Sequence, residues 1–65
     1  MNSFKRARLI EGLTQGEVAE KLGVSRVSVC KWENGKTLPT AKRLKDVAEA
    51  LHTTVGELLK EERAV

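Results

Sequence analysis

Two basic side chains in the middle of the sequence have a spacing that fits recognition of a nucleic acid. If residues 26–34 form a helix that turns by about 100° per residue, Arg26 and Lys31 share one face and Val29 and Trp32 lie opposite. The basic face is then free to enter the DNA major groove, where the base edges are distinguishable. The alternative is that these cations only form a solvated face of a helix held by its apolar side.

Residues suited to catalysis or metal binding are few. The sequence has one histidine, His52, and one cysteine, Cys30, with no partner at metal-ligand spacing and no nucleophile beside a base. We therefore expect no enzyme activity, no metal, no cofactor and no small-molecule ligand. We interpret His52 as a turn residue and Cys30 as a small neutral group near DNA, with redox sensing as the alternative for the cysteine.

Charge is distributed unevenly along the 65 residues, which carry a net charge of +3. Residues 1–45 contain ten Lys or Arg against four Asp or Glu, whereas residues 46–65 contain two against five. A basic front and an acidic back would orient the molecule on a polyanion. Because there is no apolar run of membrane-spanning length and no signal-peptide core, we expect one cytoplasmic domain over residues 1–65.

Capping residues and apolar periodicity predict an all-α fold, a compact bundle of five short helices. The helices are predicted over about 3–11, 15–22, 26–34, 41–51 and a short stretch from Val55. Their predicted N-caps are Asn2 or Ser3, Thr14, Ser25, Thr40 and Thr54, with capping boxes to Glu17 and Glu57. The first helix is predicted to turn Phe4, Ala7 and Ile10 inward, and Trp32 is predicted to be core rather than a platform for stacking bases.

The stretch TQGEVAEKLGVSRVSVCKWENG, residues 14–35, is the most informative part of the sequence. Two predicted helices are joined by a short turn containing Gly23, which is the arrangement of a helix-turn-helix. Ala19 is small where the two helices would cross, and Gly23 can adopt a positive φ without steric cost. Asn34-Gly35 is a strong signal that the second of these helices ends.

This segment resembles the helix-turn-helix of phage repressors, Cro proteins and their bacterial relatives. The similarity spans about residues 4–60 and includes Gly12-Leu13-Thr14-Gln15, Ala19, Gly23-Val24-Ser25, Ser28, Trp32-Glu33-Asn34-Gly35, Pro39, Leu44, Val47-Ala48, Leu51 and Leu58-Leu59. The sequence departs from the family at His52, where relatives often carry glycine, and at Val27, where many carry a polar residue.

The resemblance implies a role for each matching position. Arg26, Val27 and Lys31 correspond to base-reading side chains, with Arg26 suited to guanine and Val27 to a thymine methyl. Phosphate-contacting or supporting roles fall to Thr14, Gln15, Ser25, Ser28, Asn34, Lys36, Thr40 and Lys42. Gln15 also fits a plain first-turn polar residue, and Asn34 also fits a helix-terminal turn. Arg8 and Glu33 resemble the family's structural ion pair.

The function implied is a sequence-specific transcriptional regulator that binds double-stranded DNA. A repressor is the simplest form, acting as a homodimer whose third helices enter major grooves about 34 Å apart on a palindromic operator. Val55, Leu58 and Leu59 are candidates for the dimer surface, or they complete the core. The alternative function is a protein-interaction module of the same fold, such as the antitoxin of a toxin–antitoxin pair.

Overall fold

The fold is that of a computed structural model, which describes residues 2–60. The described chain forms five α-helices and no strand, in agreement with the all-α prediction. The helices are α1 (Ser3–Ile10), α2 (Gln15–Leu22), α3 (Arg26–Glu33), α4 (Ala41–Ala50) and α5 (Val55–Leu58). None of these helices within residues 2–60 is long and apolar enough to cross a membrane.

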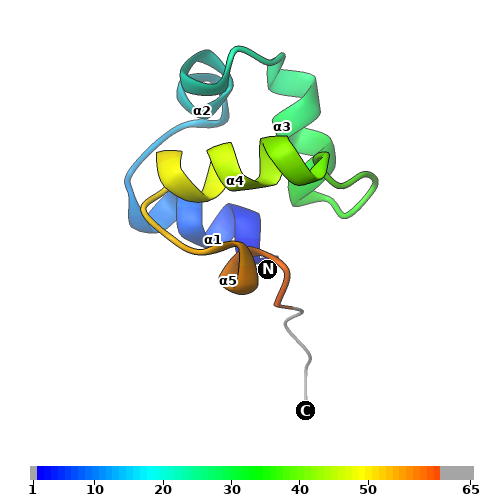
Figure 1. The fold of residues 1–65 in the computed structure, drawn as a ribbon. Coiled ribbons are helices and arrows are strands. Elements are labelled where there is room, and N and C mark those ends of the chain that lie inside the picture. The colour runs from blue at the N-terminus through cyan, green and yellow to red at the C-terminus, as the bar shows by residue number, and fades with distance from the viewer. Residues whose placement is uncertain (1, 61–65) are drawn as a thin grey trace.

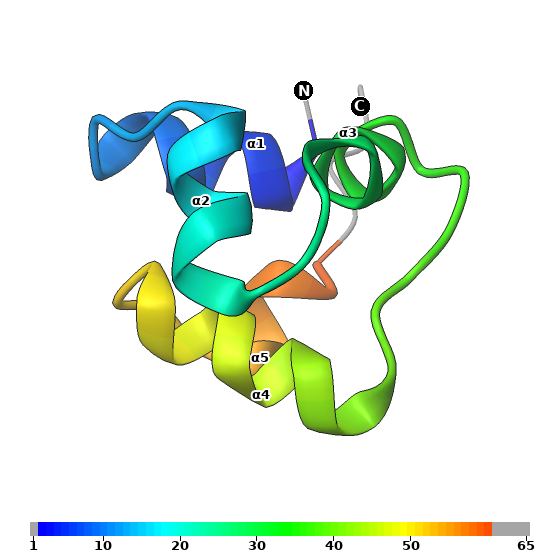
Figure 2. The ribbon, with the colours of Figure 1, turned by 90° about the horizontal axis from the view of Figure 1, so that it is seen from above.

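The helices pack so that α3 has neighbours on one side only. Helices α2 and α3 lie at the top of Figure 1, α4 runs across the front, and α5 lies below α4. Viewed from above, α1 and α3 lie on the side opposite α4, and an extended segment leads from the end of α3 to the start of α4 (Figure 2). Helix α3 packs against α2 and α1, which leaves its other side facing outward.

Each helix starts at a side chain that replaces a missing backbone partner. In all five, the N-cap side chain accepts a hydrogen bond from the backbone N–H three residues on; the N-caps are Asn2, Thr14, Ser25, Thr40 and Thr54. Thr14 and Glu17 form the complete capping box that was predicted. Of the predicted box at Thr54, the hydrogen bond from the Glu57 N–H to the Thr54 hydroxyl is formed, while the Glu57 carboxylate lies 3.7 Å from the Lys60 ammonium group.

Residues with left-handed backbone lie in the turns between helices, and some of them are glycines that the sequence indicates. Gly23 ends α2 with φ of 68°, and Gly35 follows α3 with φ of 71°. Both positions favour glycine because a Cβ there is strained. His52, between α4 and α5, also has a positive φ, 55°, although it is not a glycine. Its ring nitrogen Nδ1 lies 2.7 Å from Glu11 Oε1, which links this turn to the end of α1.

One aliphatic core with two aromatic rings lies between the helices. The Phe4 and Trp32 rings are tilted by 40° with centroids 6.3 Å apart, which is a common aromatic geometry. The buried apolar side chains are Phe4, Val18, Ala19, Leu22, Val29, Trp32, Leu44, Val47, Ala48, Leu51 and Leu58.

The prediction that Ile10 belongs to the inner face of α1 is wrong, since Ile10 is 74% exposed. A helix turns by about 100° per residue, so Ile10 lies about 120° from Phe4. The buried arc of α1 instead includes Arg8, which is only 8% exposed.

Candidate nucleic-acid interface

Helix α3 has one buried side and one exposed side. Val29 and Trp32 are 2% and 7% exposed, whereas Val27 is 61% exposed and the Arg26 and Lys31 side chains also face solvent. The two sides therefore separate as the helical spacing predicted. The exposed side joins two cations and one small apolar side chain, a combination suited to guanine edges and thymine methyl groups.

The buried side of α3 is fixed by an ion pair to α1. Arg8 Nε donates to Glu33 Oε2 at 2.6 Å, and Arg8 Nη2 donates to Glu33 Oε1 at 3.0 Å. The third guanidinium nitrogen, Nη1, donates to the carbonyl of Leu13 at 2.8 Å. Such a two-pronged pair is stronger and more directional than a single contact. It holds the end of α3 against α1 and the α1–α2 turn.

The same carboxylate also binds the start of α2, because Gln15 Nε2 donates to Glu33 Oε1 at 3.0 Å. Burial acts to raise the pKa of Glu33, but the hydrogen bonds from Arg8 and Gln15 outweigh it and lower the pKa below its ordinary value. The hydrogen bond to Glu33 raises the pKa of Arg8 against the opposing effect of burial. Arg8 and Glu33 are thus an ion pair at neutral pH, and the uncharged Gln15 amide is hydrogen-bonded to it.

The predicted phosphate-contacting residues of α2 are already engaged within the domain. Thr14 uses its hydroxyl and its backbone N–H in the capping box with Glu17. Gln15 is half-buried and gives one amide hydrogen to Glu33, which leaves its other amide hydrogen and its carbonyl oxygen for a further partner. Gln15 is therefore more than a plain first-turn polar residue, since it is held in a fixed position at the start of α2.

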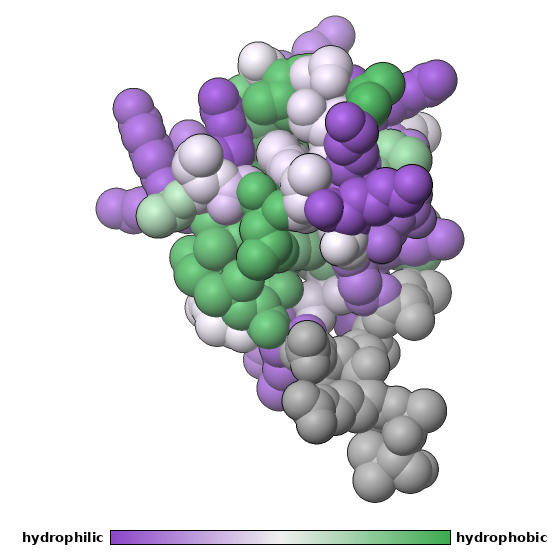
Figure 3. Space-filling view, turned by 90° about the vertical axis from the view of Figure 1, so that its right-hand side faces the viewer, coloured by the Kyte–Doolittle hydropathy of each residue, from purple (hydrophilic) through white to green (hydrophobic). Residues whose placement is uncertain are grey.

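The other predicted phosphate-contacting residues fall into two groups. Some are tied to near neighbours: the Ser25 and Ser28 hydroxyls lie 3.1 Å apart, and Asn34 Nδ2 donates to Cys30 Sγ at 3.3 Å. The remaining ones are exposed and follow α3 along the chain: Lys36, Thr40 and Lys42. Figure 3 shows long hydrophilic side chains projecting from the face of the molecule on the right of Figure 1, around a hydrophobic patch.

Two long-range side-chain hydrogen bonds that the sequence did not predict also position the helices. Asn2 Nδ2 donates to the carbonyl of Trp32 at 2.7 Å, which ties the start of α1 to the last turn of α3. Arg43 Nη1 donates to the carbonyl of Leu22 at 2.7 Å, so α4 satisfies a carbonyl at the end of α2. The cap propensity of Asn2 was a signal for its first role, but neither long-range contact has a sequence signature.

The three candidates for a dimer surface differ in exposure. Leu58 is 3% exposed and belongs to the core, so it is not available to a second subunit. Val55 is half-buried and packs against the core. Leu59 is 49% exposed and keeps about half of its surface in solvent. Leu58 of the short α5 lies in the core cluster.

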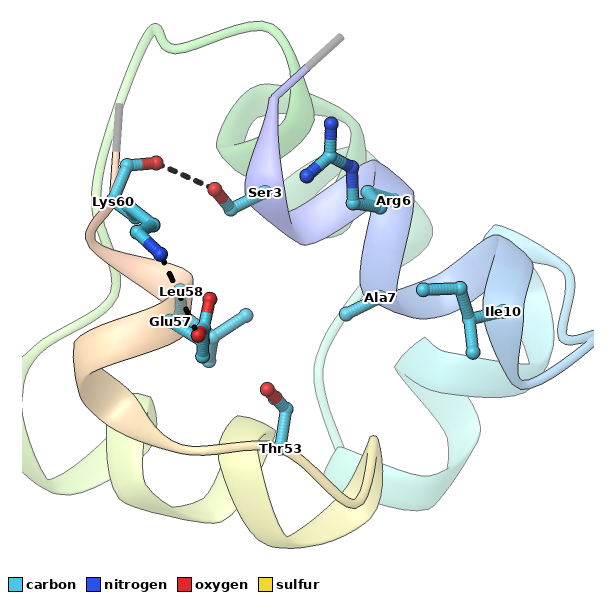
Figure 4. A pocket seen from close by; sticks show the side chains of 8 residues that line it. All are labelled: Ser3, Arg6, Ala7, Ile10, Thr53, Glu57, Leu58 and Lys60. Carbon is cyan, nitrogen blue, oxygen red and sulfur yellow. Dashed lines mark hydrogen bonds and ion pairs between the residues drawn. The ribbon is translucent and has the colours of Figure 1, made fainter. Parts of the chain in front are cut away.

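A cleft of about 230 Å³ separates α1 from α5, and α3 contributes no residue to it. Figure 4 shows side chains of the two helices facing each other across it, with Ser3 Oγ donating to the Lys60 carbonyl at 2.5 Å. Typical ligand pockets hold about 300–1,000 Å³, so this cleft is small. Within residues 2–60 there is also no cluster of three His, Cys, Asp or Glu side chains that could hold a metal ion.

The fold and the exposed side of α3 define a helix-turn-helix domain, with α2 and α3 as its two helices. A family model described as helix-turn-helix matches residues 4–58, most of the chain. The chain therefore belongs to the helix-turn-helix family, of the phage-repressor and Cro type that the sequence resembles.

Curated relatives extend this comparison. The HTH-type transcriptional activator BcrR of Enterococcus faecalis is 38% identical over 62 residues, which cover 95% of this chain and 30% of that protein. The cryptic phage CTXphi transcriptional repressor RstR of Vibrio cholerae is 40% identical over 45 residues, which cover 69% of this chain and 40% of that protein. The chain thus spans less than half the length of either relative. No solved structure matches the chain significantly.

Proposed function

We propose that this chain is a sequence-specific DNA-binding transcriptional regulator, without a catalytic role, whose α3 enters the major groove. The observation that carries the proposal is the division of α3 into a buried side, with Val29 and Trp32, and an exposed side, with Arg26 and Lys31. An α-helix fits the major groove, and a side chain must be free of the protein's own core to reach a base edge. The two relatives, both named as transcriptional regulators, support the same function.

We assign the exposed side chains to two roles at the groove, base reading and phosphate binding. Arg26 and Lys31 are the proposed base readers, and Val27 offers an apolar surface for a thymine methyl group. Lys36, Thr40 and Lys42 follow α3 and are exposed, so they are proposed to bind phosphates on either side of the groove. Gln15 is held by Glu33 at the start of α2, where backbone N–H groups also favour a phosphate.

We propose further that the protein acts as a repressor and as a homodimer in the cytoplasm, where bacterial DNA lies. One α3 reaches only a few base pairs, so a second copy is needed for useful affinity. Leu59 is the proposed centre of the dimer surface because it is apolar and 49% exposed, and it follows directly on α5, which begins at Val55. The repressor RstR supports repression, which follows simply when a bound dimer covers a promoter, whereas the activator BcrR represents the alternative direction of regulation.

Selection of bound duplexes from a random pool tests this function directly. We expect a palindromic consensus with half-sites one helical turn apart. On that site Arg26→Ala should cost about 1–3 kcal/mol and relax the base preference at one position of each half-site. Lys21→Ala is the control, since Lys21 is an exposed cation of α2 that borders Asp46 and Glu49. A pool that yields no consensus would refute the proposal.

The phosphate contacts are tested by salt dependence. Lys36→Ala should weaken binding evenly on all sequences and lower the slope of log affinity against log salt by about one unit. The reason is that a phosphate contact releases a counterion whatever the sequence. A slope equal to that of the parent protein would place Lys36 outside the interface.

A further inference from the structure

A glycine near the start of α2 lies beside the first residue of α3. Gly16 is the second residue of α2 and is half-buried. A Cβ at this position would lie 3.9 Å from Arg26 Cδ and 3.9 Å from Thr14 Oγ1. The aliphatic stem of Arg26 therefore folds back over the first turn of α2, which is the direction that long side chains take on a helix.

The backbone does not explain why this residue is a glycine. Gly16 is not among the glycines with a positive φ, so its backbone conformation is one that other residues also adopt. The nearest other part of the chain that a side chain would meet is Arg26. A side chain longer than alanine would thus compete with the Arg26 stem for the same space.

The short helix α5 contains a matched position without an arginine. Gly56 is the second residue of α5, and a Cβ there would lie 3.9 Å from Oγ1 of the N-cap Thr54 with nothing else within 4 Å. Gly16 and Gly56 thus share the helix position and the capping threonine. They differ because Gly16 has the Arg26 side chain as a neighbour and Gly56 does not.

We propose that Gly16 is a specificity-determining position of the DNA interface, because the space it leaves over α2 sets the direction in which Arg26 enters the groove. This inference rests on the proposed function, since it concerns how Arg26 reads a base. Gly16 itself makes no base contact and acts through Arg26. The base preference at the base pair read by Arg26 of α3 therefore depends on a residue of α2.

The test compares a small and a large side chain at both glycines. Gly16→Ala keeps an ordinary contact of 3.9 Å with Arg26 and should retain the parent's base preference. Gly16→Leu should reduce discrimination at the base pair read by Arg26 roughly fivefold or more, because the leucine displaces the arginine. Gly56→Ala and Gly56→Leu should leave the preference unchanged. Trp32 fluorescence on heating checks that each variant folds, and Gly16→Gln replaces Gly16→Leu if the leucine variant does not.

A double-mutant cycle separates action through Arg26 from other effects. In the Arg26→Ala background, Gly16→Leu should cause no further loss of discrimination at that base pair. The proposal is overturned if Gly16→Leu weakens all sequences evenly and equally in both backgrounds, because the side chain would then only obstruct the DNA backbone. It is also overturned if Gly16→Leu keeps the parent's preference while Arg26→Ala relaxes it.

A measurement on the protein without DNA distinguishes failure of the Gly16 inference from failure of the proposed function. In the NMR spectrum of the parent protein, nuclear Overhauser effects should join the Gly16 α-protons to the Arg26 δ-protons. If the parent selects no DNA sequence, the proposed function and this inference both fall, whether or not the contact is seen. If the parent selects a sequence but the contact is absent, only the Gly16 inference falls.

Discussion

Replacing Arg8 by methionine would remove three hydrogen bonds at once and leave the Glu33 carboxylate buried. Two of these bonds go to the carboxylate and the third goes to the carbonyl of Leu13. The side chains of Arg8 and Glu33 are only 10% and 3% exposed, so water cannot take the place of the guanidinium. The Gln15 amide would still donate to the carboxylate, and the charge of Lys5 would still attract it.

The expected loss is large for a domain of this size. Removing one partner of a buried ion pair costs about 3–5 kcal/mol, and the remaining bond from Gln15 favours the lower end of that range. A chain of 65 residues has a total stability of about 3–10 kcal/mol. Arg8→Met should therefore lower the free energy of unfolding by about 3 kcal/mol, which is at least about a third of that total.

Urea denaturation followed by Trp32 fluorescence measures this loss, because Trp32 is the chain's one tryptophan and is buried. Lys45→Met is the control, an exposed change on α4 that should alter stability by less than about 0.5 kcal/mol. The double change Arg8→Met with Glu33→Met should recover much of the loss, because neither charge is then left without a partner. A single variant as stable as the control, or a double variant no better than the single one, would refute the reasoning.

The remaining predictions concern acid and the α4–α5 turn. The pKa of Glu33 is lower in the folded state than in the unfolded chain, so as the pH falls the unfolded chain is protonated at Glu33 first. The contribution of this carboxylate to the free energy of unfolding is therefore present above the unfolded pKa of about 4.3 and is lost as the pH drops further. Glu33→Gln should flatten the acid side of the stability profile, and an unchanged slope would contradict this. At the turn, His52→Val should be about 1–2 kcal/mol less stable than His52→Gly in thermal unfolding, because a β-branched residue is strained at a φ of 55°. Equal melting temperatures would show that the turn relaxes.

The helices could be predicted from sequence because their signals are local. Each N-cap, each apolar period and the turn glycine Gly23 lie within a few residues of the structure that they determine. The two-sided nature of α3 follows from the spacing of Val29 and Trp32 alone. The ion pair of Arg8 with Glu33 was expected only because the sequence resembles a known family.

Features that depend on contacts between helices could not be predicted in the same way. Ile10 follows Phe4 and Ala7 at intervals of three residues, but it lies about 120° from Phe4 around α1 and outside the arc that meets the other helices. Leu58 and Leu59 are adjacent and chemically alike, yet one is core and the other is exposed. The hydrogen bond from Arg43 to the carbonyl of Leu22 joins residues 21 positions apart and leaves no local pattern.

The way α3 is anchored bears on how such a regulator can change over evolution. Its attachment to the domain relies on Val29, Trp32 and Glu33, while Arg26 and Val27 contribute nothing to the core. Substitutions on the outward side can therefore accumulate with little penalty in folding. On the proposed function, duplicated copies of the gene can diverge toward new DNA sites while they keep the same scaffold.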